Sequence, residues 1–388
     1  MTPERPAAPP VVMLVGAGDL GGVILELLAR DTRIGKIVAV DRDEVRGPAR
    51  VNLARLSAMA HGFCPDIEFV PADLEDEARV AELIRCTGPG LILTTASPQT
   101  WWLPSLLPAD ARARLGRAGF GAWLPVNLLL SIRLMRAVAA SGVEAITLIG
   151  PYPDAANPIL ARLGLAPTAG IGNVDEIVPK IALLAAGRLG VPPATIRVWL
   201  IADHAVEPLA FAGIGAGAEP PHYIRIEHDG RDVTAAVGGS ELLFRPVALP
   251  PGPVTHFLTA GSAARLVGTL VSGGEAFLHV PGPLGLPGGY PVTVAAGAID
   301  LALPPGLSRD EAVAINERAR RLDGIDRIDD DGSVTFTPGT VEALDETLGY
   351  RCERLSPAEV PGRAGELMAR FRQYARRHGI DVDARAGR

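Results

Sequence analysis

Residues 11–22 join an apolar run to a glycine-rich turn and then to an apolar helical pattern, VVMLVGAGDLGG. A strand that enters a G-x-G-x-x-G turn and continues as a helix is typical of a dinucleotide-binding β-turn-α unit. Gly16 permits the tight turn, Gly18 lets the backbone approach a pyrophosphate, and Gly21 lets the helix pack close to the strand. The pyrophosphate would lie at the helix N-terminus, where free N–H groups and the helix dipole favour an anion.

A second strand pattern, residues 36–40, follows and ends at Asp41. In such units an acidic residue about twenty positions after the last glycine binds the ribose hydroxyls. Asp41 would repel a 2′-phosphate and therefore favours NAD, while Arg42 and Arg46 keep NADP open. The other expected cofactor contacts lie in the turn or at the end of a later strand: Asp19, Leu20, Thr95 and Ala96.

Short apolar runs alternate with helical patterns through residues 11–150, which is typical of a parallel sheet covered by helices on both faces. We therefore predict an α/β protein whose residues 1–150 form a Rossmann-type doubly wound parallel sheet. Strand-rich segments and further helical patterns predict an α+β substrate domain in residues 151–330. Residues 331–388 contain one short strand pattern and two helical patterns, so we expect a C-terminal helical extension.

The composition argues against several classes of protein. A net charge of -7 without a basic cluster argues against nucleic acid as a partner, because phosphates require grouped Lys and Arg. We find no apolar run long enough to cross a bilayer and no signal peptide, and expect a cytoplasmic protein without a membrane partner. The three cysteines lack the spacing of metal ligands, so no metal site is expected. A small-molecule substrate fits this composition.

A long irregular segment, residues 98–121, follows the fourth predicted strand. At this edge of a parallel sheet such a segment is typical of a mobile lid. A surface loop whose Trp101 and Trp102 fill a core or subunit contact fits the same pattern. The segment also contains three arginines: Arg112, Arg114 and Arg117.

Several motifs, taken in order and spacing, resemble the lactate/malate dehydrogenase family over most of the chain to about residue 325. After the glycine turn and Asp41, Thr95-Ala96-Ser97 falls where the family has Thr-Ala-Gly. Residues 190–205 resemble the approach to the family's catalytic histidine, and residues 281–303 resemble its late hairpin. The resemblance implies an NAD-dependent dehydrogenase that forms a homo-oligomer.

The resemblance also implies that His204 is the acid/base. In the family, a histidine exchanges a proton with the substrate hydroxyl while hydride moves to the nicotinamide, and an aspartate orients the imidazole. Asp175 is the expected partner of His204, with Asp203 and Glu176 as alternatives. The ungapped register would place the family's aspartate nearer Ile177.

The chain departs from the family at its substrate-binding positions. Val178 stands where the family has the arginine that binds the substrate carboxylate. In the ungapped register Lys180 takes this position instead, and its ammonium group lacks the bidentate fork of an arginine. The family's Asn-Pro matches Tyr152-Pro153 by spacing and Asn157-Pro158 by residue type, so Tyr152 and Asn157 are both substrate-binding candidates. No spacing selects a polarising arginine within residues 98–121. These departures predict a divergent member with a different substrate.

The sequence therefore predicts an NAD-dependent oxidoreductase that transfers hydride between the nicotinamide and a hydroxyl or carbonyl carbon, with His204 as acid/base. Two alternatives retain the nucleotide. One is an NAD-dependent lyase, epimerase or glycosidase that oxidises its substrate transiently, and the other is a non-catalytic nucleotide-binding protein. Residues 331–388 extend beyond the usual end of the family, and no motif assigns them a role.

Overall fold

The computed structural model describes residues 10–215 and 217–382. Its parallel sheet has six strands in the order β3-β2-β1-β4-β5-β6. The strands are β1 (Val11–Val15), β2 (Lys36–Asp41), β3 (Ile67–Pro71), β4 (Leu91–Thr94), β5 (Ile146–Ile149) and β6 (Ala169–Gly170). All neighbouring pairs are parallel. The predicted doubly wound sheet is confirmed, although β6 lies beyond residue 150, where we expected the first domain to end.

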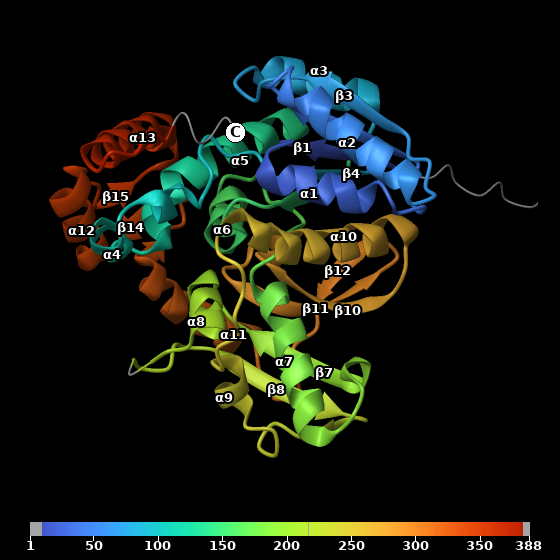
Figure 1. Cartoon of the computed structure of the whole chain (residues 1–388), viewed down its shortest axis with the longest axis vertical. Helices are drawn as coiled ribbons and strands as arrows, with labels where there is room; N and C mark the ends of the chain where they lie inside the picture. The colour runs from blue at the N-terminus through green and yellow to red at the C-terminus, as the bar shows by residue number, and fades with distance from the viewer. Residues whose placement is uncertain (1–9, 216, 383–388) are drawn as a thin grey trace, which may run out of the picture.

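Helices cover both faces of this sheet because its strands are apolar on both sides (Figure 1). The helices are α1 (Asp19–Leu28), α2 (Arg46–Ala60), α3 (Glu77–Thr87), α5 (Leu124–Ser141) and α10 (His256–Ser272). On one face α1, α2 and α10 share a core with Val12 and Leu14. On the other, α3 and α5 share a core with Met13 and Val15.

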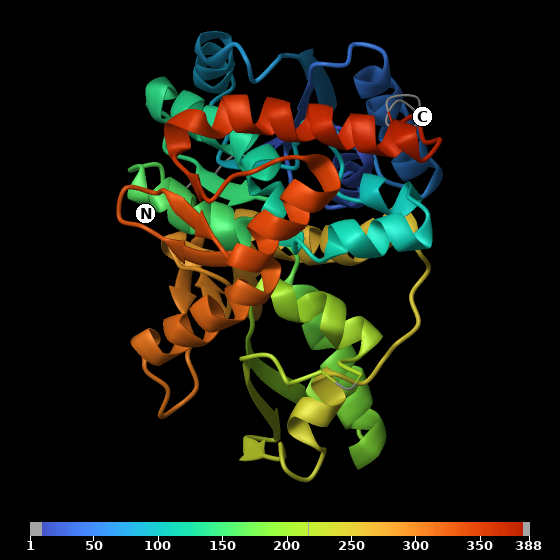
Figure 2. The same cartoon turned by 90° about the vertical axis from the view of Figure 1, so that its left-hand side faces the viewer.

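One helical stretch, Phe120–Ser141, is long and apolar enough by length and composition to cross a membrane. Our reading that no apolar run reaches this length was wrong. In its most apolar window, 67% is buried inside the protein. The stretch ends in α5, which packs between the parallel sheet and the C-terminal segment (Figure 2). This helix is therefore part of the protein core.

Two antiparallel sheets follow the parallel sheet. The first contains β7 (Ile196–Ile201), β8 (Tyr223–His228) and β9 (Arg231–Asp232), and the second contains β10 (Ala276–Pro281), β11 (Gly289–Ala295) and β12 (Ala298–Leu301). A bridge between Ala202 and Gly289 connects the two sheets. The helices of this part are α6 (Pro153–Arg162), α7 (Val174–Leu189), α8 (Glu207–Ala212), α9 (Gly239–Leu243) and α11 (Arg309–Arg320). The expected α+β character is confirmed.

The C-terminal segment contains a small sheet as well as helices. Its elements are β13 (Ile325–Ile328), β14 (Val334–Phe336), α12 (Pro338–Leu348), β15 (Arg354–Leu355) and α13 (Val360–Arg377). The predicted boundary at residue 330 would divide its three-stranded sheet. The segment shares a core with α5, α6 and α4 (Ala109–Gly116), and α13 lies across this side of the molecule in Figure 2.

Candidate active site

The glycine turn has the geometry that its sequence predicts. Gly16 has φ +94°, and a Cβ there would lie 2.7 Å from the Ala96 nitrogen. A Cβ at Gly21 would lie 1.8 Å from the Gly16 carbonyl oxygen, whereas one at Gly18 would meet nothing within 4 Å. Thr95 donates its hydroxyl to the Gly16 oxygen at 2.9 Å. Two glycines thus permit close packing, and the open face at Gly18 fits the approach of a pyrophosphate.

Asp41 holds the turn from the end of β2. Its carboxylate accepts hydrogen bonds from the Ala17 backbone N–H at 2.7 Å and the Asp43 backbone N–H at 2.9 Å. Because a carboxylate has about four acceptor positions, lone pairs remain for ribose hydroxyls. Arg42 is largely exposed and lies 3.9 Å from Asp73, which leaves it near the same edge. These residues fit a dinucleotide.

Two tryptophans follow β4, one in contact with the N-terminal end of α1 and the other with the N-terminal end of α10. Trp102 donates its indole N–H to Asp19 Oδ2 at 3.0 Å, and Trp101 donates to Nε2 of His256 at 2.8 Å. Leu20, in the first turn of α1, packs against the core on that side of the sheet. The segment after β4 therefore lies beside the N-terminal end of α1, where the cofactor is expected.

The rest of residues 98–121 packs against the C-terminal segment. Thr340 donates its hydroxyl to the Ala118 carbonyl at 2.8 Å, and Tyr374 donates to the Ala111 carbonyl at 3.3 Å. The three arginines among which no spacing selects a polarising one contact the Ser105 carbonyl (Arg112), Asp110 (Arg114) and Glu346 (Arg117). The surface-loop interpretation fits this structure better than a free lid, because the C-terminal segment provides a packing surface.

His204 lies directly after β7 and meets side chains from three other segments. Its Nδ1 lies 2.6 Å from Oδ2 of Asp323, and Tyr152 donates its hydroxyl to the same oxygen at 3.0 Å. Phe120 stacks on the imidazole with ring centroids 4.4 Å apart. In the described part of the chain, Nε2 of His204 has no hydrogen-bond partner. One imidazole nitrogen is thus oriented and the other is free to exchange a proton.

Asp175 is not the partner of His204. Its carboxylate pairs with Arg265 of α10 at 2.6 Å, because the first turn of α7 directs it toward that helix. Glu176, the second alternative, accepts from the Thr259 hydroxyl at 2.8 Å. The observed partner, Asp323, is 119 positions from His204 and follows α11 in a short turn. No motif marks it in the sequence.

Two substrate-binding candidates have structural contacts instead. The Lys180 ammonium group donates to three backbone carbonyls, those of Ala210, Leu243 and Arg245. A buried cation requires such acceptors, and these carbonyls lie in α8, at the end of α9 and just after α9. Asn157 donates to the Gly282 carbonyl at 3.0 Å and so supports that turn. Of the substrate candidates, the structure brings only Tyr152 to His204.

Buried carboxyl groups surround His204. Asp154 accepts the His204 backbone N–H at 2.9 Å, and burial raises its pKa to about 6. Burial also raises the pKa of Glu207 to about 7 and that of Asp203 well above its usual range. Burial alone would lower the pKa of His204, but Asp323 and its hydrogen bond raise it to about 10. His204 therefore retains its proton at neutral pH.

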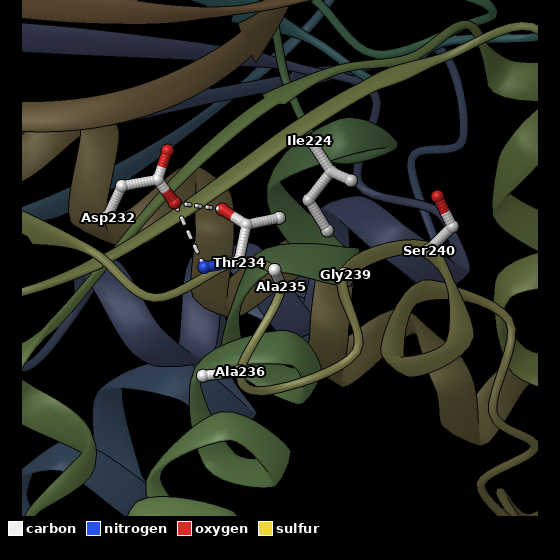
Figure 3. A pocket seen from close by; sticks show the side chains of 7 residues that line it. All are labelled: Ile224, Asp232, Thr234, Ala235, Ala236, Gly239 and Ser240. Atoms are coloured by element: carbon white, nitrogen blue, oxygen red, sulfur yellow. Dashed lines mark hydrogen bonds between the residues drawn. The ribbon is translucent and has the colours of Figure 1, made fainter.

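A large open cavity lies away from these residues. It has a volume of about 660 Å³ and is lined by Ile224, Asp232, Thr234, Ala235, Ala236, Gly239 and Ser240 (Figure 3). Asp232 accepts hydrogen bonds from the Thr234 hydroxyl at 2.6 Å and from the Thr234 backbone N–H at 2.9 Å. The carboxylate of Asp232 is therefore already paired. None of the predicted site residues lines this cavity.

Comparisons with known proteins locate the similarity at the level of the fold. No protein-family model and no curated protein sequence matches the chain. Among solved structures, malate dehydrogenase from Cryptosporidium parvum is 14% identical over 81% of this chain and 98% of its own, with a TM-score of 0.55. Malate dehydrogenase from Plasmodium falciparum is 12% identical over 87% and 99%, with a TM-score of 0.54.

A third solved structure contains ligands. It is the lactate dehydrogenase of Cryptosporidium parvum with lactic acid and nicotinamide adenine dinucleotide, which is 13% identical to this chain. It covers 81% of this chain and 96% of its own, with a TM-score of 0.52. The resemblance to lactate and malate dehydrogenases is therefore confirmed for the fold.

Proposed function

We propose that the protein is an NAD-dependent oxidoreductase in which His204 exchanges a proton with the oxygen of the reacting carbon. The observation that supports this most directly is the His204–Asp323 contact of 2.6 Å beside the Tyr152 hydroxyl. NAD supplies hydride transfer when it is bound, and Gly18, Asp41 and the N-terminus of α1 would hold it.

Protonated His204 favours one direction of the reaction, the reduction of a carbonyl group. Because Asp323 holds the proton on His204 at neutral pH, the imidazolium is set to donate it to a carbonyl oxygen. The oxygen of the reduced carbonyl group would take its proton from Nε2 of His204, which leaves a neutral imidazole. The neutral imidazole is then reprotonated from solvent. We therefore propose carbonyl reduction with NADH.

The test measures cofactor binding and turnover separately. NADH and NADPH fluorescence would report binding, and NADH absorbance would report turnover with 2-oxo acids, neutral ketones and sugar-derived carbonyls. His204→Ala should bind NADH like the wild type and lose carbonyl reduction. Equal turnover by this variant would disprove the role of His204, and the absence of NADH binding would disprove the nucleotide site.

One observation favours a second candidate, a non-catalytic nucleotide-binding protein. Oδ2 of Asp323 accepts a hydrogen bond from the Tyr152 hydroxyl, the one substrate-binding candidate beside His204, so this hydroxyl is already paired. In this second candidate the Tyr152 hydroxyl stays with Asp323 and does not bind a substrate. NADH binding without turnover of any carbonyl compound would support it, and Asp323→Ala would then not reduce any activity.

A further inference from the structure

Asn173 has a backbone conformation that its residue type rarely adopts. It is the N-cap of α7, with φ +49° and ψ −109°. A positive φ is uncommon for residues other than glycine, and asparagine adopts it mostly in the left-handed region, where ψ is also positive. Such strain costs free energy and persists only where the surrounding structure holds the residue in place. The contacts of Asn173 show what holds it.

The first contacts fix the backbone of Asn173. One oxygen of the Glu176 carboxylate accepts the Asn173 backbone N–H at 3.1 Å and the Thr259 hydroxyl at 2.8 Å. Glu176 belongs to α7 and Thr259 to α10, so both helices hold this residue. A Cβ on the preceding residue, Gly172, would lie 2.5 Å from the same Glu176 oxygen. The turn before α7 is therefore closely fitted to α10.

The second contact is made by the side chain of Asn173. Its amide donates to Oδ2 of Asp154, a fully buried residue in the first turn of α6. Oδ1 of Asp154 accepts the backbone N–H of His204 at 2.9 Å. One buried carboxylate thus binds Asn173 through one oxygen and His204 through the other. The strained position of Asn173 places its amide where this carboxylate can accept from both residues.

Asp154 and Asp323 hold different parts of His204. Oδ2 of Asp323 lies 2.6 Å from the ring nitrogen Nδ1, whereas Asp154 binds the backbone of the same residue. A contact at the ring alone would leave the backbone of His204 free to shift, and a catalytic group that is misplaced by about 1 Å can lose much of its effect. With both contacts, the residue is fixed at its backbone and at its ring.

Asparagine is the residue type that these contacts require. An N-cap needs an acceptor oxygen, which Ser and Asp supply as well as Asn. The Asp154 carboxylate also needs a donor, and only Asn among these adds an amide N–H, which reaches further than a Ser hydroxyl. We propose that Asn173 is a positioning residue, which holds the Asp154 carboxylate against the backbone of His204 and so fixes the imidazole for proton transfer. The inference rests on the proposed function and adds a residue to its site.

Hydrogen exchange tests the positioning of His204 without any turnover. In protein with isotopically labelled histidine, the seven labelled residues include His204, and His204→Ala identifies its amide signal. Asn173→Gly removes the side chain, and glycine adopts a positive φ without strain. We expect the His204 amide to exchange at least about tenfold faster in this variant. The midpoint of thermal unfolding should change by less than about 3 °C, because relief of strain offsets the lost hydrogen bond.

Unchanged exchange of the His204 amide in Asn173→Gly would overturn the inference. If this variant does not fold, Asn173→Ser takes its place, because it retains an acceptor oxygen for the N-cap and loses the amide. The same acceleration of exchange is expected in Asn173→Ser, and unchanged exchange there would have the same meaning.

Kinetics test the consequence for the reaction. The substrate is pyruvate, butanone or glyceraldehyde, whichever the wild type reduces fastest with NADH. Asn173→Gly should lower kcat by about tenfold or more, while the dissociation constant of NADH, measured by fluorescence, changes less than about twofold. A higher KM at unchanged kcat would indicate a loss of substrate binding and would overturn the positioning role.

Asp76→Gly is the matched control. Asp76 is the N-cap of α3, and its carboxylate accepts the Arg79 backbone N–H at 3.0 Å. Its replacement removes a helix cap that has no contact with His204, so it should reduce stability and leave kcat unchanged. Asn173→Gly should show the opposite combination, a lower kcat at nearly unchanged stability.

A reciprocal exchange isolates the contact between Asn173 and Asp154. Asn173→Asp and Asp154→Asn each disturb the match of donor and acceptor, and each should lower kcat by about tenfold. In the double variant the amide at position 154 donates to the carboxylate at position 173, and its oxygen still accepts the His204 N–H. The double variant should be about fivefold more active than either single variant, whereas independent effects would multiply. Activity no higher than that of either single variant would contradict the inference.

Failure of the proposed function would give a different result. Absence of NADH binding, or of turnover by the wild type, would contradict the proposed function and leave the exchange experiment to decide the contact. Faster exchange of the His204 amide in Asn173→Gly would then still support the positioning of His204, and unchanged exchange would overturn it.

Discussion

The glycine turn and the surroundings of His204 are built in different ways. The turn is held by residues of β1, β2 and β4, whose order follows from the parallel sheet, and its contacts are mostly with backbone atoms. The His204 site is held by side chains that follow β5 and β7, by Phe120, and by Asp323 from the beginning of the C-terminal segment. Short-range backbone geometry is therefore visible in a sequence, whereas a side-chain partner can come from any segment.

The largest expected effect is at the glycine turn. Gly21→Ala places a Cβ 1.8 Å from the Gly16 oxygen, so we expect the free energy of unfolding to fall by about 3 kcal/mol or more. Gly18→Ala places a Cβ in open space and should leave stability nearly unchanged while weakening NADH binding. Thermal unfolding and NADH fluorescence measure the two effects. Equal stability of Gly21→Ala and the wild type would contradict the packing role.

The second prediction compares two buried aspartates. Asp323→Asn removes the charge that holds the proton on His204, and should lower kcat/KM for carbonyl reduction by about 100-fold at neutral pH. The alkaline limb of the pH profile should also move toward lower pH, because the pKa of His204 falls. Asp175→Asn should change neither quantity. The reverse result would restore Asp175 as the partner.

The third prediction concerns stability and pH. Folding raises the pKa of Asp154 to about 6, of Glu207 to about 7 and of His204 to about 10. Each contribution to stability is complete below the unfolded pKa and is lost as the pH rises through the folded pKa. The contributions of Asp154 and Glu207 are lost by about pH 7, so the fall in the free energy of unfolding between pH 7 and 10 comes from His204 and should reach about 1 kcal/mol or more. Urea titrations would measure this slope, and Asp323→Asn should flatten it.

The smallest effect is expected at the exposed ion pair between Arg117 and Glu346, whose atoms lie 2.7 Å apart. Both side chains are more than half exposed, so Arg117→Ala should reduce stability by at most about 0.5 kcal/mol. Thr340→Val removes the buried hydrogen bond to Ala118 and should cost about 1 kcal/mol. Urea unfolding of both variants would show whether buried contacts attach residues 98–121 to the C-terminal segment. A larger loss in Arg117→Ala would contradict this.

Much of the fold could be predicted because its signals are local. The apolar strands and the turn from Gly16 to Gly21 each depend on neighbouring residues, and the structure contains both. The sheet of the C-terminal segment was missed for the opposite reason. Its strands are two to four residues long, and they form by pairing with one another.

The candidate site shows the same difference between features that depend on nearby residues and contacts between distant segments. The order of residues along the chain was sufficient to place His204 after a strand, Tyr152 after another and Asp41 at the end of the second strand. Only the tertiary structure determined that Asp323 meets His204, that Asp175 pairs with Arg265 and that Lys180 binds carbonyls. Backbone conformation depends on a few adjacent residues, whereas the pairing of buried charges depends on which distant segments the core brings together.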